Sequence, residues 1–257
     1  MAVGIRVLEH NAMVYRRTWQ GSVLSSILSP VLFLAAMGIG LGGYVNRGGG
    51  AAALGGVPYL AFLAPGLLAA QAMQTAAFET TYPIMGKIVW DKLYDAMLAT
   101  PLTVRDLLAG ELEWLVVRLT IVCTAFLAVM TVFGAVRSPL GILALPVVVL
   151  TGLAFAAPIM AFSATQRRDQ NFNVLFRFGI TPLFLLSGTF FPLEQLPALV
   201  RPLAYLTPLY HGVALARSLT LGSVDPVAAT IHLAVIATFL AAGLVLTARS
   251  FRSRLVV

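Results

Sequence analysis

Charged side chains are scarce in this chain of 257 residues. Asp, Glu, Lys and Arg together make up 11% of it, whereas 59% of its residues are hydrophobic and its mean hydropathy is +0.91. Ordinary soluble domains carry about twice that charged fraction, because a soluble domain of this size needs polar groups over its exterior. The composition therefore excludes an ordinary soluble domain, and we expect lipid to be the solvent for most of the surface.

Cysteine and the motifs of common enzymes are also missing. The single cysteine, Cys123, excludes an intrachain disulfide, and its apolar surroundings indicate a small buried residue. The sequence has no Gly-x-x-x-x-Gly-Lys-[Ser/Thr] loop to hold the phosphates of ATP, no His-Glu-x-x-His and no Gly-x-Ser-x-Gly. The three histidines, His10, His211 and His232, lie far apart in the sequence. We therefore expect no catalytic residue, no metal site and no cofactor bound by this chain itself.

The excess of basic residues does not indicate a nucleic-acid partner. The formal net charge is +7, but the Lys and Arg residues lie between apolar runs instead of forming a contiguous stripe. We interpret the excess as a charge bias that orients membrane segments, and we expect no nucleic acid to bind.

Long apolar runs are what the sequence does contain. A helix needs about 20 mainly apolar residues to cross the hydrocarbon core of a bilayer, and such a run must be helical to satisfy its backbone hydrogen bonds in lipid. Six stretches qualify or nearly qualify: 23–45, 59–82, 112–136, 140–164, 174–190 and 227–248. The sequence therefore predicts an all-α polytopic membrane protein with six transmembrane helices, in which residues 1–257 form a single domain. Gly38 and Gly42 give the first helix a face for close packing, either within one subunit or between two.

The basic residues divide the connections into two sides. Eleven lie in the N-terminal segment, the second-to-third and fourth-to-fifth connections and the C-terminal tail: Arg6, Arg16, Arg17, Lys87, Lys92, Arg105, Arg167, Arg168, Arg249, Arg252 and Arg254. Four lie in the other connections: Arg47, Arg137, Arg201 and Arg217. By the positive-inside rule, we predict a multi-pass protein of the cytoplasmic membrane with both termini in the cytoplasm.

Two segments on the predicted cytoplasmic side mix apolar and charged residues. Residues 1–20 suit a helix lying in the membrane interface, either as a lipid anchor or as a contact for a partner. Residues 85–105 contain apolar side chains at roughly helical spacing with charges between them, which suits a short amphipathic helix that docks on another protein. A solvated loop is the alternative for this second segment. Thr103 is expected to cap the helix that follows it.

Charges inside the predicted spans carry a second set of hypotheses. Glu79 lies toward the cytoplasmic end of its span, and Arg118 shares a helix face with Glu111 at the start of the third. A charge in a span is costly unless it is paired. These residues are therefore either interfacial side chains or an internal ion pair, or they contact a substrate; the structural interpretation is favoured because charges near span ends reach the interface.

The connection between the fifth and sixth spans is too apolar for an exposed loop, yet Pro192, Pro197, Pro202 and Pro208 interrupt it repeatedly. We therefore predict that residues 188–222 form an outer re-entrant helical hairpin, two short helices that dip into the outer leaflet and whose ends protein covers.

The same connection carries a resemblance to a known family. Its pattern comprises Ser187-Gly188, Phe191-Pro192, Leu196-Pro197, Pro208-Leu209, His211 and Arg217. It resembles the signature of ABC type-2 transporter permeases, in the branch of nodulation-factor (lipooligosaccharide) and daunorubicin-type drug exporters. Tyr210 departs from the pattern, since relatives often have a smaller hydroxyl residue there, which weakens inference about the substrate. The resemblance covers the whole chain.

The resemblance implies a transmembrane permease subunit of an ATP-driven exporter that works by alternating access. Two cytoplasmic ABC ATPase subunits would bind ATP and Mg, and a second permease copy or a related permease would complete the complex in the membrane lipid. The ATPase would dock on the 85–105 segment, with the coupling residues Lys87, Trp90, Asp91, Lys92, Tyr94 and Asp95. The substrate path or outer gate would include Phe190, Phe191, Pro192, Pro208, Tyr210 and His211. Because no charge stands near the middle of a predicted span, we expect an amphiphilic cargo such as a glycolipid, a lipid-linked sugar or a hydrophobic drug.

Two other functions remain as alternatives. A membrane-embedded transferase acting on lipid-linked substrates would need clustered carboxylates, and Glu111, Glu113 and Asp106 are its closest candidates. An ion-coupled secondary transporter would need carboxylates at the midplane and broken helices in both halves, whereas Glu79 is off-centre and no inverted repeat is visible.

Overall fold

The computed structural model describes residues 5–47, 54 and 56–255, and this part of the chain contains helices and turns but no strand. The first helical stretch is continuous through α1 (Ile5–Phe33), the π-helical η1 (Leu34–Leu41) and α2 (Gly42–Arg47). The second comprises α4 (Tyr59–Thr80), α5 (Tyr82–Met85) and the π-helical η2 (Gly86–Trp90), and α6 (Leu93–Leu98) follows it. Then come α7 (Val104–Val132), η3 (Pro139–Leu143) and α8 (Ala144–Thr165).

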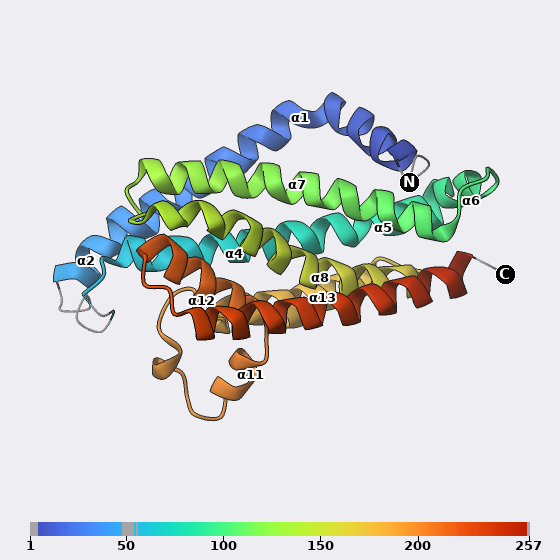
Figure 1. The fold of residues 1–257 in the computed structure, drawn as a ribbon. Helices are drawn as coiled ribbons and strands as arrows, with labels where there is room; N and C mark the ends of the chain where they lie inside the picture. The colour runs from blue at the N-terminus through green and yellow to red at the C-terminus, as the bar shows by residue number, and fades with distance from the viewer. Residues whose placement is uncertain (1–4, 48–53, 55, 256–257) are drawn as a thin grey trace.

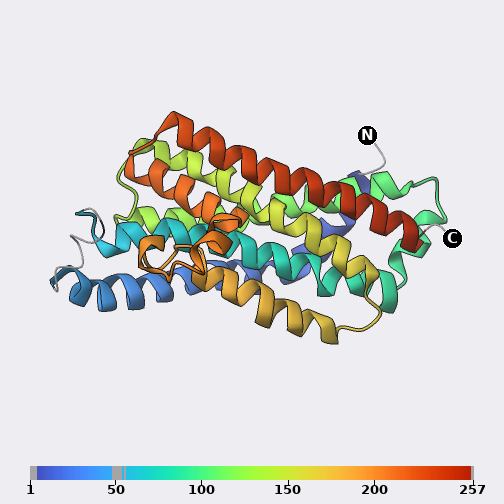
Figure 2. The same ribbon diagram turned by 90° about the horizontal axis from the view of Figure 1, so that it is seen from below.

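The last third of the chain is more broken. A helical stretch is built from α9 (Gln170–Val174), the π-helical η4 (Leu175–Ile180) and α10 (Thr181–Leu186). The short η5 (Leu193–Gln195) and α11 (Arg201–Tyr205) lie beside the bundle, and α12 (Pro208–Leu221) and α13 (Pro226–Leu255) return to it (Figures 1 and 2). The all-α fold predicted from the sequence is therefore confirmed.

Five helical stretches of the described chain are long and apolar enough to cross a membrane. They are Trp19–Val45, Tyr59–Trp90, Val104–Val132, Pro139–Thr165 and Pro226–Leu255. They correspond to five of the six predicted spans. The remaining one, at 174–190, coincides with the short stretch from α9 to α10, so the sixth span stays a prediction.

The third span begins at Val104, earlier than the predicted residue 112, because Thr103 caps α7 as expected. The Thr103 hydroxyl accepts a hydrogen bond from the Asp106 amide at 3.3 Å, and the Asp106 carboxylate accepts one from the Thr103 amide at 3.1 Å. This reciprocal arrangement satisfies two amides that the first helical turn leaves without backbone partners. The longer helix puts Arg118 at its midpoint instead of just inside its start.

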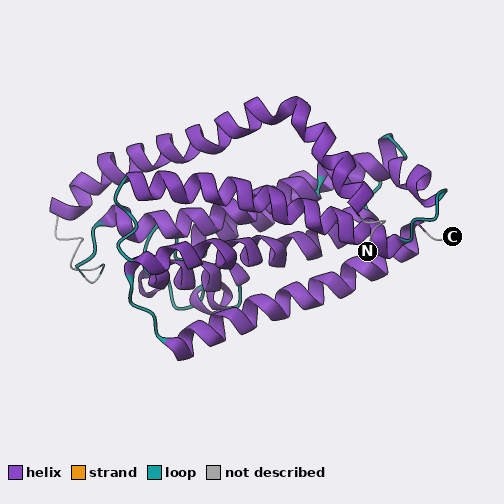
Figure 3. Cartoon of the chain, turned by 45° about the horizontal axis from the view of Figure 1, so that its top comes forward, coloured by secondary structure: helices purple, strands orange, loops and turns teal. Residues whose placement is uncertain are grey.

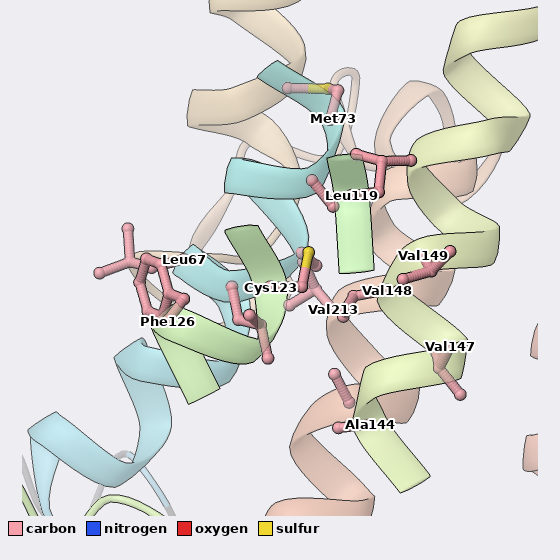
Figure 4. Close-up of a cluster of buried hydrophobic side chains, with 14 of the residues drawn as sticks. Leu67, Met73, Leu119, Cys123, Phe126, Ala144, Val147, Val148, Val149 and Val213 are labelled. Atoms are coloured by element: carbon pink, nitrogen blue, oxygen red, sulfur yellow. The ribbon is translucent and has the colours of Figure 1, made fainter. Parts of the chain in front are cut away.

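The centre of the bundle is formed by α4 and α8, which are the most buried of the long helices, whereas α1 and α13 are the most exposed. Side chains from α4, α7, α8 and α12 meet in one apolar cluster, part of which is drawn in Figure 4. Cys123 lies in this cluster and is fully buried, as predicted. Interleaved small and branched residues let these four helices approach closely.

Both ends of the described chain lie at the same end of the bundle as α6, and α2 lies at the opposite end (Figures 1 and 3). The N-terminal segment is not a separate helix. It belongs to α1, which bends and returns to pack on α7 with Val7 and Asn11 buried. Residues 1–4 of the predicted interfacial helix lie outside the described residues.

Glycines set the closest helix contacts. A Cβ atom on Gly38 would lie 2.3 Å from the Leu60 side chain, and one on Gly42 would lie 3.7 Å from Tyr59. Of the two possibilities left open by the sequence, these contacts favour packing within one subunit. The tightest approach of two spans is at Gly243 of α13, where a Cβ would lie 2.6 Å from Pro158 Cδ and 2.9 Å from Pro158 N on α8. Next to it, the Thr247 hydroxyl donates to the Ala157 carbonyl at 2.6 Å.

Candidate functional site

A polar face runs along α4, in an otherwise apolar span. Gln71, Gln74, Thr75 and Glu79 stand at positions i, i+3, i+4 and i+8, which places them on one side of the helix. The Gln71 amide donates to the Thr75 hydroxyl at 3.2 Å. The Gln74 side chain is half-buried and makes no hydrogen bond with another side chain or carbonyl in the described part of the chain. An unpartnered amide at membrane depth is costly, so this face is suited to a polar ligand or water.

The polar face lines a groove between α1, α4 and α7. Three adjoining cavities share lining residues along it, with volumes of about 260, 340 and 150 Å³ from the α6 end outward. Glu79 and Arg118 line the first two, whereas Ser29, Gln71 and Gln74 line the second and third. Aromatic rings line the far end: Phe33, Phe126 and Phe184. The groove is thus polar through its inner and middle parts and apolar at its outer part.

The two intramembrane charges that the sequence singled out pair with each other inside this groove. Arg118 Nε donates to Glu79 Oε1 at 2.9 Å. The Arg118 guanidinium also lies over the Tyr15 ring, 4.6 Å from its centroid, and Tyr15 packs edge-on against Trp114. The charges cancel and the N-terminal part of α1 covers them. The expectation of an internal ion pair is fulfilled, although its partner is Glu79 rather than Glu111.

A second buried ion pair joins three helical stretches near α6. Lys87 of η2 donates to Glu111 Oε1 of α7 at 2.7 Å and to Asn11 Oδ1 of α1 at 2.9 Å. The Asn11 amide in turn donates to Glu111 Oε2 at 3.2 Å. The side chain of Glu111 is 4% exposed and that of Lys87 is 15% exposed. Each charge is therefore satisfied inside the protein, and Asn11 completes a closed triangle of hydrogen bonds.

The coupling residues proposed from the sequence divide into two sets. Trp90, Asp91, Lys92 and Asp95 are exposed at the end of the bundle, around the turn from η2 into α6. Lys87 instead lies in the internal ion pair, and Tyr94 is fully buried against Phe251 of α13. Burial, and secondarily the Glu111 carboxylate, hold the pKa of the Tyr94 hydroxyl well above its usual range, so it stays neutral.

The turn itself has an unusual backbone at Lys92, whose φ is 47°. This left-handed conformation is uncommon for a residue other than glycine, asparagine or aspartate. It reverses the chain between η2 and α6 within two residues and leaves the Asp91 and Lys92 side chains outside.

The proposed outer-gate residues pack in two groups. Phe190 contacts Phe184 and Phe33, with ring centroids 5.0 and 6.5 Å away, and so lies beside the apolar end of the groove. Phe191 packs with the small cluster around Leu193. Pro192 precedes η5, and Pro208 is buried at the start of α12. Only the first group adjoins the groove.

The second group contains a histidine pair that the sequence did not predict. His211 Nε2 lies 2.9 Å from the Tyr205 carbonyl, to which it must donate, and His211 Nδ1 lies 2.7 Å from His232 Nδ1. In the neutral pair, His232 is therefore the donor to His211. The ring of Tyr210 packs edge-on against both. No group of three or more potential metal ligands exists among the described residues, and the pair serves to join α11, α12 and α13.

Arg217, the last residue of the family-like pattern, fastens the outer segment to α4. It donates to the Phe62 carbonyl at 3.0 Å and to the Gly188 carbonyl at 2.8 Å, and it lies 3.7 Å above the Phe62 ring. Gly188 has a φ of +76°, which glycine adopts without strain. The Ser-Gly and Arg elements of the pattern thus meet in space although they are far apart in the sequence.

The carboxylates that would have suited a transferase do not gather. Glu111 is neutralised by Lys87, Asp106 caps α7, and Glu113 is exposed.

Comparisons with known proteins agree with this architecture. The chain matches the family described as "ABC-2 type transporter" over residues 6–221. It is 32% identical to Nodulation protein J of Rhizobium leguminosarum bv. viciae over 252 residues, which cover 98% of this chain and 94% of that protein. It is 35% identical to Nodulation protein J of Sinorhizobium fredii over 213 residues, or 83% of this chain and 79% of that protein. The chain therefore belongs to the ABC-2 type transporter family, and it is a multi-pass permease subunit that works with an ABC ATPase and is not itself an enzyme.

Proposed function

We propose that the chain is the permease of an ABC exporter and moves an amphiphile along the groove between α1, α4 and α7. The observation that carries the proposal is the division of this groove into a polar part at Gln71, Gln74 and Thr75 and an apolar part at Phe33, Phe126 and Phe184. The polar part suits hydroxyl and amide groups of a sugar-like head. The Glu79–Arg118 pair adds no net charge, so a neutral head is favoured over an ion. Glycolipids, lipid-linked sugars and hydrophobic drugs with a polar group fit this description.

The arrangement across the membrane follows from the charge split and from the fold. Eleven basic residues lie on the side of both termini and α6, against four on the other, and we place the richer side in the cytoplasm. With both termini on one side, the number of crossings must be even. We propose that residues 170–186 supply the sixth, since a helix of that length rises about 25 Å. Residues 188–222 then form the outer re-entrant hairpin.

We propose a complex of two permeases, either two copies or this chain and a related one, with two ATPase subunits that bind ATP and Mg. ATPase closure would rock the permeases between inward- and outward-facing states. The exposed apolar side chains of α1, among them Leu24, Leu28 and Leu32, are then covered by lipid or by the second permease. The N-terminal part of α1 lies at the cytoplasmic interface.

The cargo proposal is tested by replacing the unpartnered amide. In a reconstituted complex with its ATPase, amphiphiles with neutral polar heads are expected to stimulate ATP hydrolysis, whereas small hydrophilic solutes are not. Gln74→Leu keeps the side-chain size but removes the hydrogen-bonding groups. We expect it to lower the apparent affinity for such amphiphiles about 5- to 10-fold, which is the effect of losing one or two hydrogen bonds.

The matched control for this variant is Thr238→Val, which removes an exposed hydroxyl from α13 away from the groove. It should leave the stimulation unchanged. If only hydrophilic solutes stimulate, the amphiphile is the wrong cargo. If Gln74→Leu behaves as the control does, the groove is not its path.

The ATPase-docking surface is proposed to consist of Trp90, Asp91, Lys92 and Asp95, the exposed members of the coupling set. The double reversal Asp91→Lys/Lys92→Asp inverts both charges, and aspartate tolerates the left-handed backbone at 92. We expect it to lower the stimulated ATPase rate at least about fivefold while the melting temperature of the permease stays within a few degrees, because misplaced charges at an interface cost several kcal/mol.

Docking is measured by co-purification of the ATPase with the permease. The control is Arg137→Asp, a reversal of an exposed charge at the opposite end of the bundle. Normal docking and transport by the double variant would show that the ATPase binds elsewhere.

A further inference from the structure

Two adjoining cavities lie between the start of α7 and the end of α13, apart from the groove. One has a volume of about 690 Å³ and the other of about 260 Å³. They share Val104, Arg105 and Arg252, and Arg249 lines the smaller one. The sequence analysis used these arginines only as orientation signals, and the coupling surface does not include them.

The lining of these cavities is positive and has no counter-charge. Arg105, Arg249 and Arg252 are exposed, and among the described residues none of the three makes an ion pair. None of the residues lining either cavity is acidic. The nearest carboxylate in sequence, Asp106, is engaged with the Thr103 amide and hydroxyl at 3.1 and 2.6 Å. Three guanidinium groups around one hollow favour an anion with several oxygens, such as a phosphate.

The rest of the smaller cavity is apolar. Leu108, Val245 and Ala248 form its wall together with Val104. Val245 and its neighbour Leu246 are 51% and 49% exposed on the outer face of α13, where a long apolar helix of this kind meets hydrocarbon. A free phosphate would gain nothing from this wall, whereas a phospholipid would place its phosphate at the arginines and an acyl chain along Val245.

We propose that this cavity is a binding site for one anionic phospholipid, held by Arg105, Arg249 and Arg252. Basic pockets between transmembrane helices are suited to anionic headgroups. The site lies at the end of the bundle that we place in the cytoplasm, and it requires neither the proposed cargo nor the proposed ATPase surface. The bound lipid would join α7 to α13 at the point where α13 leaves the membrane.

The test is lipid retention by the full chain in mild detergent, measured by native mass spectrometry. Dioleoyl phosphatidylglycerol and dioleoyl phosphatidylcholine have the same acyl chains and differ in net charge. We expect the protein to prefer phosphatidylglycerol by about 10- to 100-fold, since each arginine near an anionic surface contributes about fivefold. The triple variant Arg105→Gln/Arg249→Gln/Arg252→Gln should lose this preference.

The matched control removes three other exposed arginines: Arg6→Gln/Arg167→Gln/Arg168→Gln. It should keep the preference, and an equal loss would mean that overall charge, not this cavity, attracts the lipid. An unchanged preference in the first triple variant would also overturn the proposal. Inorganic phosphate should not displace the lipid at equal concentration, and displacement would identify the site as one for a free anion.

A second variant tests the apolar wall while all three arginines remain. Ala248→Phe fills the smaller cavity and is expected to weaken phosphatidylglycerol retention about tenfold at an unchanged melting temperature. Undiminished retention by this variant would exclude an acyl chain from the cavity.

Discussion

Replacing Lys87 by methionine is expected to destabilise the protein by about 3–5 kcal/mol, because it leaves the Glu111 carboxylate buried without a counter-ion. Glu111 is 4% exposed, and without Lys87 its one remaining side-chain hydrogen bond would come from the Asn11 amide, at 3.2 Å. We expect the melting temperature in detergent to fall by about 10 °C. Methionine preserves the length and the packing of the lysine stem, so the change isolates the charge.

The double variant Lys87→Met/Glu111→Gln should recover much of the loss, since neither partner is then an unpaired charge. Lys92→Met is the matched control, because it removes an exposed lysine five residues further along and should shift the melting temperature by no more than about 2 °C. Equal melting temperatures for Lys87→Met and Lys92→Met would contradict the role given to the ion pair.

Replacing Gly243 by leucine is expected to prevent the correct packing of α8 on α13. Even the Cβ atom of alanine would lie 2.6 Å from Pro158 Cδ and 2.9 Å from Pro158 N, and the second of these is a backbone atom that cannot move aside alone. We expect Gly243→Ala to cost about 1–3 kcal/mol and Gly243→Leu to cost more. The measurement is the yield of monodisperse protein after solubilisation, together with its melting temperature.

Gly43→Ala is the control for these variants, since no heavy atom lies within 4 Å of the Cβ it would add. It should be neutral or slightly stabilising, because alanine is the better helix former. Thr247→Val, which keeps the shape but removes the hydrogen bond to the Ala157 carbonyl, should cost about 1 kcal/mol. A Gly243→Leu protein as stable as Gly43→Ala would show that α13 does not need this close contact.

The spans and their order were predictable because they depend on local composition, which long apolar runs display directly. The Thr103 cap was predictable for the same reason, since its partner Asp106 is three residues away. The pairing of charges was not, because Lys87 meets a carboxylate 24 residues away and an amide 76 residues away. Arg118 was matched with Glu111 by helix periodicity, but the α4–α7 contact gives it Glu79 instead.

The polar face of α4 was missed although its signal is in the sequence. Gln71, Gln74, Thr75 and Glu79 follow helical spacing inside a predicted span, and attention to charges alone passed over the neutral amides. The left-handed backbone of Lys92 and the meeting of His211 with His232 had no such signal. The first depends on where two helices must turn, and the second on the return of α13 beside α12.

The π-helical segment η4 sets the rotation of the residues that follow it. A π-helical turn contains one residue more than an α-helical turn, so shortening Leu175–Ile180 by one residue would restore regular α-helical register. The helix would remain continuous, but everything after it in α10 would turn by about 100° about the axis. Phe184, which now contacts Phe190 at 5.0 Å and lines the apolar end of the groove, would face another direction. Chain length in this short stretch therefore governs which side chains the groove presents, so a relative that lacks one of these residues would line the same channel with a different face of the helix.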